Sequence, residues 1–267
     1  VAVVTGASRG VGRGVALALG DAGATVYVTG RTIRDGEAPL PGTIGATADE
    51  VSRRGGRGIA ARCDHRRDDE VRALFRRVAD EAGRLDLLVN NVFCVPDGVL
   101  TPAPFWEQPL SFWDDMHAVG LRSHYVASVL AAPLLLRSDA GLIVNISSFG
   151  GASFQINVAY GVGKAGVDRL AADMAHDLRP RGVAAVSLYP GVVRTERLLA
   201  LGDASPFSLT HAESPELTGR VIAALARDPA RMRYTGRTLV VAELADEYGV
   251  LDIDGARPRS PRRRERS

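Results

Sequence analysis

The residues best suited to chemistry in this sequence are Tyr160 and Lys164, which lie four positions apart. Lys164 is the only lysine among the 33 basic residues. Lysine carries a compact point charge and arginine a planar fork, so the two exchange poorly where a charge must reach a small target. On a helix, positions i and i+4 share one face, so the phenol and the ammonium can approach one ligand. A nearby cation favours the phenolate, so the pair suits general acid–base catalysis, the alternative being a surface tyrosine and lysine on an amphipathic helix.

A glycine-rich turn near the start of the chain has the spacing of a phosphate-binding loop. Residues 1 to 5 form an apolar run that predicts a buried strand, and a helix is expected from the turn to about residue 22. Glycines permit a tight turn and let the backbone approach a phosphate, which the helix N-terminus favours electrostatically. This G-x-x-x-G-x-G pattern between a strand and a helix predicts a dinucleotide site. The predicted cofactor-binding residues of the turn are Gly6, Ser8, Arg9, Gly10, Val11 and Gly12.

The next two strands bear on the choice of cofactor. The strand at 25 to 29 ends in Gly30 and Arg31, where an acidic residue would bind a free ribose 2′-hydroxyl and an arginine would accommodate a 2′-phosphate. Arg31, together with Arg9, therefore favours NADP(H) over NAD(H), the alternative being that both are ordinary surface residues of an arginine-rich chain. Asp64 follows the strand at 58 to 63, where it either meets the adenine amino group or caps a turn.

The remaining elements predict one α/β domain over residues 1–256. Strands are expected at 85–89, 141–146, 183–188 and 238–241, and helices at 47–54, 68–82, 112–136, 157–179 and 215–227. This alternation indicates a Rossmann-type, doubly wound parallel sheet of seven strands with helices on both faces and ligand at the carboxyl ends of the strands. Residues 192–213 are expected to form a substrate loop or mobile lid, with an ordinary surface connection as the alternative. The expected substrate pocket is bounded by Phe93, Trp106, Phe154 and Tyr189.

Composition argues against several other classes of protein: membrane-spanning, disulfide-bonded, metal-binding and nucleic-acid-binding. With 46% hydrophobic residues the chain can bury a large core, and it contains no apolar run of the length of a membrane span. Cys63 and Cys94 show no C-x-x-C pairing, which indicates a reducing compartment such as the cytoplasm, and the five histidines lack metal-ligand spacing. Residues 257–267 carry six arginines and one glutamate and predict a basic, disordered tail, for which a nucleic-acid partner is the less favoured interpretation.

Five motifs in one order resemble the short-chain dehydrogenase/reductase family over residues 1–245. They are the glycine turn, Asn90-Asn91 after the fourth strand, Ser148 after the fifth, Tyr160-x-x-x-Lys164, and Pro190-Gly191-x-x-x-Thr195. The resemblance implies that Tyr160 donates a proton to a carbonyl oxygen as hydride arrives from the nicotinamide, that Ser148 holds that oxygen, and that Lys164 binds the nicotinamide ribose and lowers the tyrosine pKa. It further implies that Asn90 lies against the adenosine-side ribose and that the Pro190 motif, through Val193 and Thr195, holds the carboxamide.

Within the family, the segments around Arg31, Tyr160 and 251–255 are similar to the dehydrogenase/reductase member-one branch. That branch implies NADPH-dependent reduction of ketone, steroid and xenobiotic carbonyls, and the family implies a homodimer or homotetramer. Two departures stand out: Phe93 replaces the small residue of the usual Asn-Asn-Ala-Gly, and Gly120 aligns with an asparagine that usually interrupts a long helix and holds a relay water. We expect glycine to preserve the bend and activity to survive through a modified relay. The alternative is a cofactor-binding regulator with weak or no catalysis.

Overall fold

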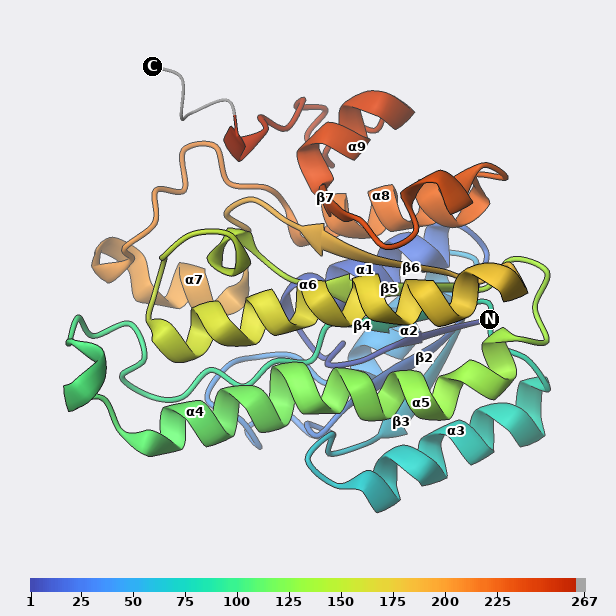
Figure 1. The fold of residues 1–267 in the computed structure, drawn as a ribbon, viewed down its shortest axis with the longest axis horizontal. Helices are drawn as coiled ribbons and strands as arrows, with labels where there is room; N and C mark the ends of the chain where they lie inside the picture. Colours follow the sequence, from blue (N-terminus) through green and yellow to red (C-terminus); the bar gives the residue numbers. More distant parts are fainter. Residues whose placement is uncertain (263–267) are drawn as a thin grey trace.

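A parallel sheet of seven strands runs through the centre of the protein (Figure 1). The computed structural model describes residues 1–262. In spatial order the strands are β3 (Arg57–Arg62), β2 (Thr25–Gly30), β1 (Ala2–Val4), β4 (Leu87–Asn90), β5 (Leu142–Ile146), β6 (Ala184–Tyr189) and β7 (Thr238–Val240), each parallel to its neighbours. The order reverses between β1 and β4, where ligands bind in sheets of this kind. The predicted doubly wound α/β fold is confirmed.

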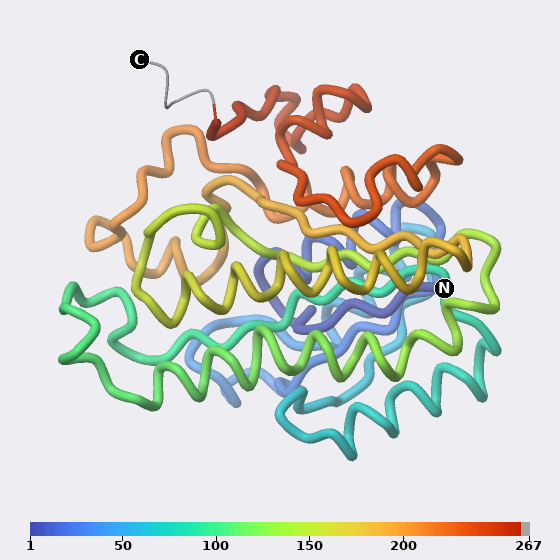
Figure 2. The backbone as a smooth tube through the Cα atoms, viewed as in Figure 1, coloured from blue at the N-terminus to red at the C-terminus, as the bar shows by residue number. Residues whose placement is uncertain are grey.

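Helices cover both faces of the sheet, which explains why its inner strands are buried on both sides, whereas the edge strand at Arg57–Arg62 is partly exposed. On one face α1 (Gly10–Asp21), α2 (Ile44–Arg53) and α8 (Pro215–Arg227) share a core with the sheet, and α9 (Val241–Tyr248) extends that core after β7. On the other face α3 (Asp68–Ala82), α5 (Ser123–Leu135) and α6 (Val158–Leu178) form a second core. The segments that follow β4 and β6, teal-green and orange in Figure 2, project from the same end of the sheet. That end carries the carboxyl termini of the strands.

The helix predicted over 112–136 is interrupted. It is divided into α4 (Leu110–His117), a π-helical turn (Ala118–Arg122) and α5. Gly120 has φ +143°, a conformation that residues with a Cβ rarely adopt, so the bend expected at this glycine is confirmed. By length and composition the stretch Leu110–Leu135 could cross a membrane, but in its apolar 18-residue window half of the residues are buried inside the fold. It packs as the core helix of a globular domain.

Two other segments differ in detail from the expectation. The helix expected from residue 47 begins at Ile44, because the Thr43 side chain accepts a hydrogen bond from Ala46 N and caps it. The expected loop over 192–213 contains a helix, α7 (Glu196–Leu201), which Thr195 caps in the same way.

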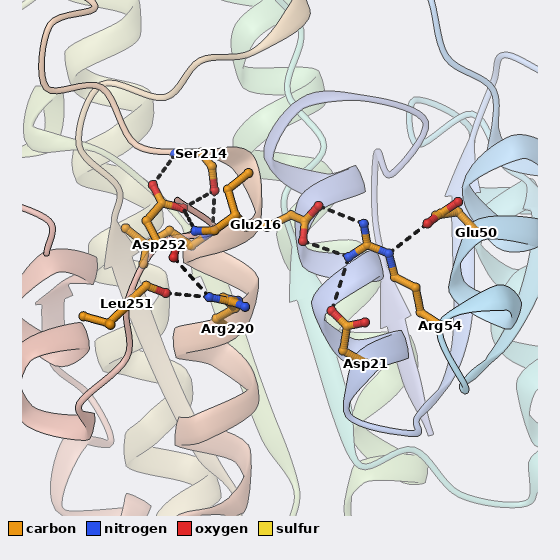
Figure 3. A network of polar contacts seen from close by, with 10 residues as sticks. Asp21, Glu50, Arg54, Ser214, Glu216, Arg220, Leu251 and Asp252 are labelled. Atoms are coloured by element: carbon orange, nitrogen blue, oxygen red, sulfur yellow. Dashed lines mark hydrogen bonds and ion pairs between the residues drawn. The ribbon is translucent and has the colours of Figure 1, made fainter. Parts of the chain in front are cut away.

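Charged side chains tie α8 to the helices beside it (Figure 3). The Arg54 guanidinium donates to both carboxylate oxygens of Glu216 at 2.8 and 3.1 Å and also binds Glu50 and Asp21. These partners belong to α8, α2 and α1, so one arginine joins the ends of three helices. The helices α1 and α8 also touch backbone to backbone, because a Cβ at Gly14 would lie 2.1 Å from the carbonyl oxygen of Pro215.

The C-terminal segment around Asp252 is anchored to the N-terminal half of α8 and to its N-cap residue (Figure 3). The Asp252 carboxylate accepts hydrogen bonds from the Ser214 hydroxyl and from Ser214 N, and Arg220 donates to the carbonyl of Leu251 at 2.7 Å. Further along, Ser260 and Arg262 both bind the Glu243 carboxylate on α9. The first residues of the predicted basic tail therefore contact the domain through polar groups, and residues 263–267 lie outside the described residues.

Candidate active site

The first turn of α6 fixes the position of Tyr160. Asn157 caps this helix, because its Oδ1 accepts a hydrogen bond from Tyr160 N at 2.8 Å. Lys164 follows one turn later on the same helical face and is 7% exposed. The capped helix thus fixes the position of the phenol relative to the ammonium.

Ser148 reaches Tyr160 from the end of β5. The Tyr160 hydroxyl donates to Ser148 Oγ at 2.7 Å, and Gly150 N donates to the same oxygen at 3.1 Å. A Cβ at Gly150 would lie 2.4 Å from Tyr160 Cε1, so only glycine allows the ring this close to the turn after β5. The structure brings together the three residues for which a catalytic role was predicted.

The protonation of the phenol differs from the expectation. Burial raises the pKa of Tyr160, and the hydrogen bond with Ser148 lowers it in part. Lys164 Nζ donates to the carbonyl oxygen of Ile146 at 3.2 Å and lies 5.8 Å from the centre of the Tyr160 ring. The ammonium is therefore not hydrogen-bonded to the phenol in the described part of the chain, and the tyrosine is protonated at neutral pH.

Asp168 is a site residue that the sequence analysis missed. Its carboxylate accepts a hydrogen bond from Ser187 Oγ at 2.7 Å and another from the Tyr189 hydroxyl. Burial lowers the pKa of Lys164 to about 8, and the negative charge of Asp168 opposes that shift. The signal was available, because Tyr160, Lys164 and Asp168 follow one another at intervals of four residues on one helix face.

The glycine turn has the shape of a phosphate cradle. Gly6 and Gly10 have φ values of +68° and +57°, and a Cβ at Gly12 would lie 2.3 Å from the carbonyl oxygen of Gly6. Asn91 holds the turn from the side, since its Nδ2 donates to the carbonyls of Thr5 and Gly6 at 2.9 and 3.0 Å. Ser8 is buried within the turn and Val11 is half-buried on the first turn of α1. All three glycines are therefore required by backbone geometry.

An anionic group already contacts this cradle. Gly10 N donates to Glu196 Oε2 at 2.7 Å, so a carboxylate from α7 stands where a phosphate oxygen would be held at the N-terminus of α1. The Gly10 N–H thus points out of the turn and can donate a hydrogen bond to an anion. The residues present fit the diphosphate of a dinucleotide cofactor.

The two arginines predicted to select the cofactor have different surroundings. The Arg9 guanidinium donates to the carbonyls of Leu40, Pro41 and Gly42 and so holds the loop that follows β2. Arg31 is exposed directly after β2 and has no hydrogen bond or ion pair within residues 1–262. The guanidinium of Arg31 is therefore available to a ligand, whereas that of Arg9 is committed to the loop after β2.

Two other predicted cofactor residues, Asp64 and Asn90, have structural contacts. The Asp64 carboxylate accepts from Arg66 N at 3.0 Å, so it caps a turn, one of the two roles left open. Asn90 is fully buried, and its Nδ2 donates to Ser128 Oγ and Asn145 Oδ1 at 3.0 and 2.9 Å. This side-chain amide therefore links β4 to β5 and to α5 inside the fold.

The segment after β6 returns toward the glycine turn. Pro190 is buried at the end of β6, and Val193 forms a parallel bridge with Glu213. A Cβ at Gly10 would lie 3.5 Å from Thr195 Cγ2, so Thr195 stands next to the cradle. The glycine turn and the segment that follows β6 therefore lie side by side.

The four residues expected around a substrate pocket do not gather in one place. Phe93 lies edge-on to Tyr160 with ring centres 5.8 Å apart, and Tyr189 is buried against Asp168 and Phe149. Trp106 and Phe154 are 72% and 79% exposed. Two of the aromatic rings therefore pack near α6 and two face solvent.

Comparisons with known proteins agree with this geometry. A family model described as short chain dehydrogenase matches residues 1–204. Dehydrogenase/reductase SDR family member 1 of Mus musculus is 47% identical over 269 residues, which cover 96% of this chain and 83% of that protein. The Homo sapiens protein of the same name is 46% identical over 271 residues with the same coverage.

A solved structure gives the same result at the level of the fold. A short chain dehydrogenase from Mycobacterium thermoresistibile superposes with a TM-score of 0.80 at 26% identity, over 94% of this chain and 88% of that one. The family resemblance seen in the motifs is confirmed, and with it an oxidoreductase that uses a nicotinamide cofactor. The chain belongs to the short-chain dehydrogenase/reductase family.

Proposed function

We propose that the protein is an NADP(H)-dependent oxidoreductase that interconverts a carbonyl group and a secondary alcohol on an apolar substrate. The observation that carries the proposal is the 2.7 Å hydrogen bond between Tyr160 and Ser148, one helical turn from the buried Lys164. A phenol, a hydroxyl and an ammonium at this spacing can hold a carbonyl oxygen and protonate it.

Each side chain has a distinct role in the reduction. A dinucleotide cofactor, whose diphosphate the glycine turn would hold, would supply a hydride from its nicotinamide to the carbonyl carbon. Tyr160, protonated because burial raises its pKa, gives its proton to the carbonyl oxygen. Ser148 Oγ accepts from Gly150 N and, before substrate binds, from the Tyr160 hydroxyl. When the phenol turns its single hydrogen to the carbonyl oxygen, the hydrogen of the serine hydroxyl can bind the same oxygen. Lys164 supplies a positive charge that favours the phenolate left behind, and in the oxidation direction the proton returns to the phenolate.

The preference for NADP(H) rests on Arg31. Its guanidinium is exposed at the end of β2 and carries a permanent charge suited to a phosphate. We expect Arg31→Ser to raise the KM for NADPH about 10- to 100-fold and to leave the KM for NADH nearly unchanged. Arg34→Ser, in the same exposed loop, is the matched control. Equal effects of Arg31→Ser on both cofactors would contradict the preference.

An apolar ketone is the substrate class best suited to the surroundings of Tyr160. Phe93, Ile156 and Tyr160 pack in one small apolar cluster with Val99 and Met116. A panel of aliphatic, aromatic and steroid ketones tests the proposal by following the loss of NADPH absorbance. Tight NADPH binding with no turnover of any ketone, alcohol, enone or quinone would favour the alternative, a cofactor-binding regulator.

We further propose that two or more copies associate through α5 and α6. Tyr125 and Val129 on α5 are exposed, as are Val158 and Val162 on α6, and in each pair the side chains are four residues apart on one helix face. Both helices lie on the same side of the sheet (Figure 1). A cytoplasmic location is supported by Cys63 and Cys94, which are free thiols.

A further inference from the structure

The two departures from the family pattern, Phe93 and Gly120, touch each other beside the catalytic residues. A Cβ at Gly120 would lie 2.5 Å from Phe93 Cδ2 and 2.9 Å from Phe93 Cε2. The φ of +143° at Gly120 excludes an ordinary side chain for a second, independent reason. The Phe93 ring therefore fills the space into which a side chain at position 120 would project.

The position of this ring is fixed by the elements around it. Cys94 N donates to the Val119 carbonyl at 2.9 Å, which ties the loop after β4 to the π-helical turn. On the other side, His124 Nε2 lies 3.0 Å from the Val92 carbonyl oxygen. The ring itself packs in the apolar cluster that includes Met116 and Ala159.

The face of the Phe93 ring meets the ammonium of Lys164. Nζ lies 4.6 Å from the ring centre, within the range of a cation–π interaction. An ammonium has three donors, and Nζ makes one hydrogen bond within residues 1–262, to the Ile146 carbonyl. The aromatic face thus supplies negative potential to a buried cation with few polar contacts.

We propose that Phe93 is a positioning residue for the Lys164 ammonium, and that Gly120 is the residue that makes room for the Phe93 ring. The ring holds the charge beside Tyr160 through its face, in the region where the family pattern would place a polar side chain and its water. The catalytic role of Lys164 rests on the proposed function, whereas the contact between ring and ammonium does not.

Other charged and titratable groups face the same ammonium and act in known directions. Asp168 on α6 raises the pKa of Lys164, and burial lowers it. His124 on α5 is buried and neutral, since burial lowers its pKa to about 3, so it adds no charge at neutral pH. Tyr160, on the same helix as Lys164, is likewise neutral. Within residues 1–262 the ring therefore favours the charged form of Lys164 together with Asp168 and the Ile146 carbonyl.

The single lysine makes this proposal directly measurable. In protein labelled with lysine carrying ¹³C at Cε, Lys164 gives one lysine signal, which can be titrated without cofactor or substrate. We expect Phe93→Leu to lower the pKa of Lys164 by about half a unit to one and a half units, because the cation loses its aromatic partner in an apolar site. The upfield ring-current shift that Phe93 gives the Lys164 Hε protons should be lost in the same variant, which leaves the contribution of the Tyr160 ring 5.8 Å from Nζ.

Phe93→Tyr is the matched control, because it keeps the ring and should keep both the pKa and the ring-current shift. Phe93→Met serves in place of the leucine variant if the latter does not fold by circular dichroism. An unchanged or raised pKa of Lys164 in the variant without the ring would overturn the proposal. Because this titration needs no turnover, a failure of the proposed oxidoreductase activity would leave it interpretable.

Discussion

At the scale of single residues, the site depends on side chains whose ionisation is set by burial. Motif spacing was enough to predict Tyr160, Lys164 and Ser148, and the structure brings them together. Spacing could not predict that the pKa of Tyr160 is raised, because the effect arises from enclosure by elements far apart in the sequence. The same limit explains why Asn90 was expected at the cofactor, although its amide is bonded inside the fold.

Glu213 gives a pH-dependence prediction at this scale. Burial raises the pKa of Glu213 to about 7, with a smaller raising effect from Asp252, while a hydrogen bond from Gly191 N opposes both. The folded state thus holds a proton that the unfolded chain releases near pH 4.3, so stability should fall as pH rises from about 5 to 8. Glu213→Gln should remove this fall and raise the unfolding midpoint at pH 8 relative to wild type.

The measurement is thermal unfolding of both proteins between pH 5 and 8. Glu107→Gln, at an exposed position, is the control and should keep the wild-type pH dependence. Parallel curves for wild type and Glu213→Gln would show that Glu213 does not titrate in this range.

At the scale of elements, α7 and the glycine turn are coupled through Glu196. Its carboxylate binds Gly10 N, the amide that fits a cofactor phosphate, so it must leave before a phosphate can bind there. Sequence reasoning predicted the turn and a loop over 192–213. It did not predict this contact, because α7 and α1 are distant in sequence and the pairing depends on the tertiary fold.

Glu196→Gln should therefore strengthen NADP⁺ binding. Removing a charge that competes at a helix N-terminus is expected to lower the Kd about two- to tenfold. Isothermal titration calorimetry measures this directly. Asp203→Asn removes the same charge from the segment just after α7 and should have little effect, whereas weaker binding in Glu196→Gln would refute the competition.

The bend between α4 and α5 gives a second element-scale prediction. Gly120→Asn should cost about 2–4 kcal/mol of folding free energy, because the residue would be strained at φ +143° and would collide with Phe93. Part of that cost should disappear in a Phe93→Ala background. Chemical denaturation of the two single variants and the double variant gives the coupling, and strictly additive effects would rule out the contact.

At the scale of the whole molecule, the sheet was predictable because its buried parallel strands are continuous apolar runs. The long-range polar contacts of Arg54 and Asp252 could not be predicted, because their partners are distant in sequence and come near only in the folded protein. The basic tail shows the same limit, because Ser260 and Arg262 reach Glu243 on α9 through polar groups.

The proposed association through α5 and α6 can be tested at this scale. Wild-type protein should sediment as a dimer or tetramer at micromolar concentration, and Val129→Glu combined with Val162→Glu should shift it toward monomer, because charges are costly in an apolar interface. Ile33→Glu alters an exposed apolar residue on the loop after β2 and should not change the oligomeric state. A monomeric wild-type protein would contradict the proposal.

The most direct test of the central claim is the rate of NADPH oxidation by a panel of ketones, compared between wild type and Tyr160→Phe at matched cofactor saturation. If Tyr160 donates the proton, the variant should lose about 10²- to 10⁴-fold in kcat while its Kd for NADPH stays the same. A wild-type protein that turns over none of the ketones, or a Tyr160→Phe variant as fast as wild type, would contradict the account.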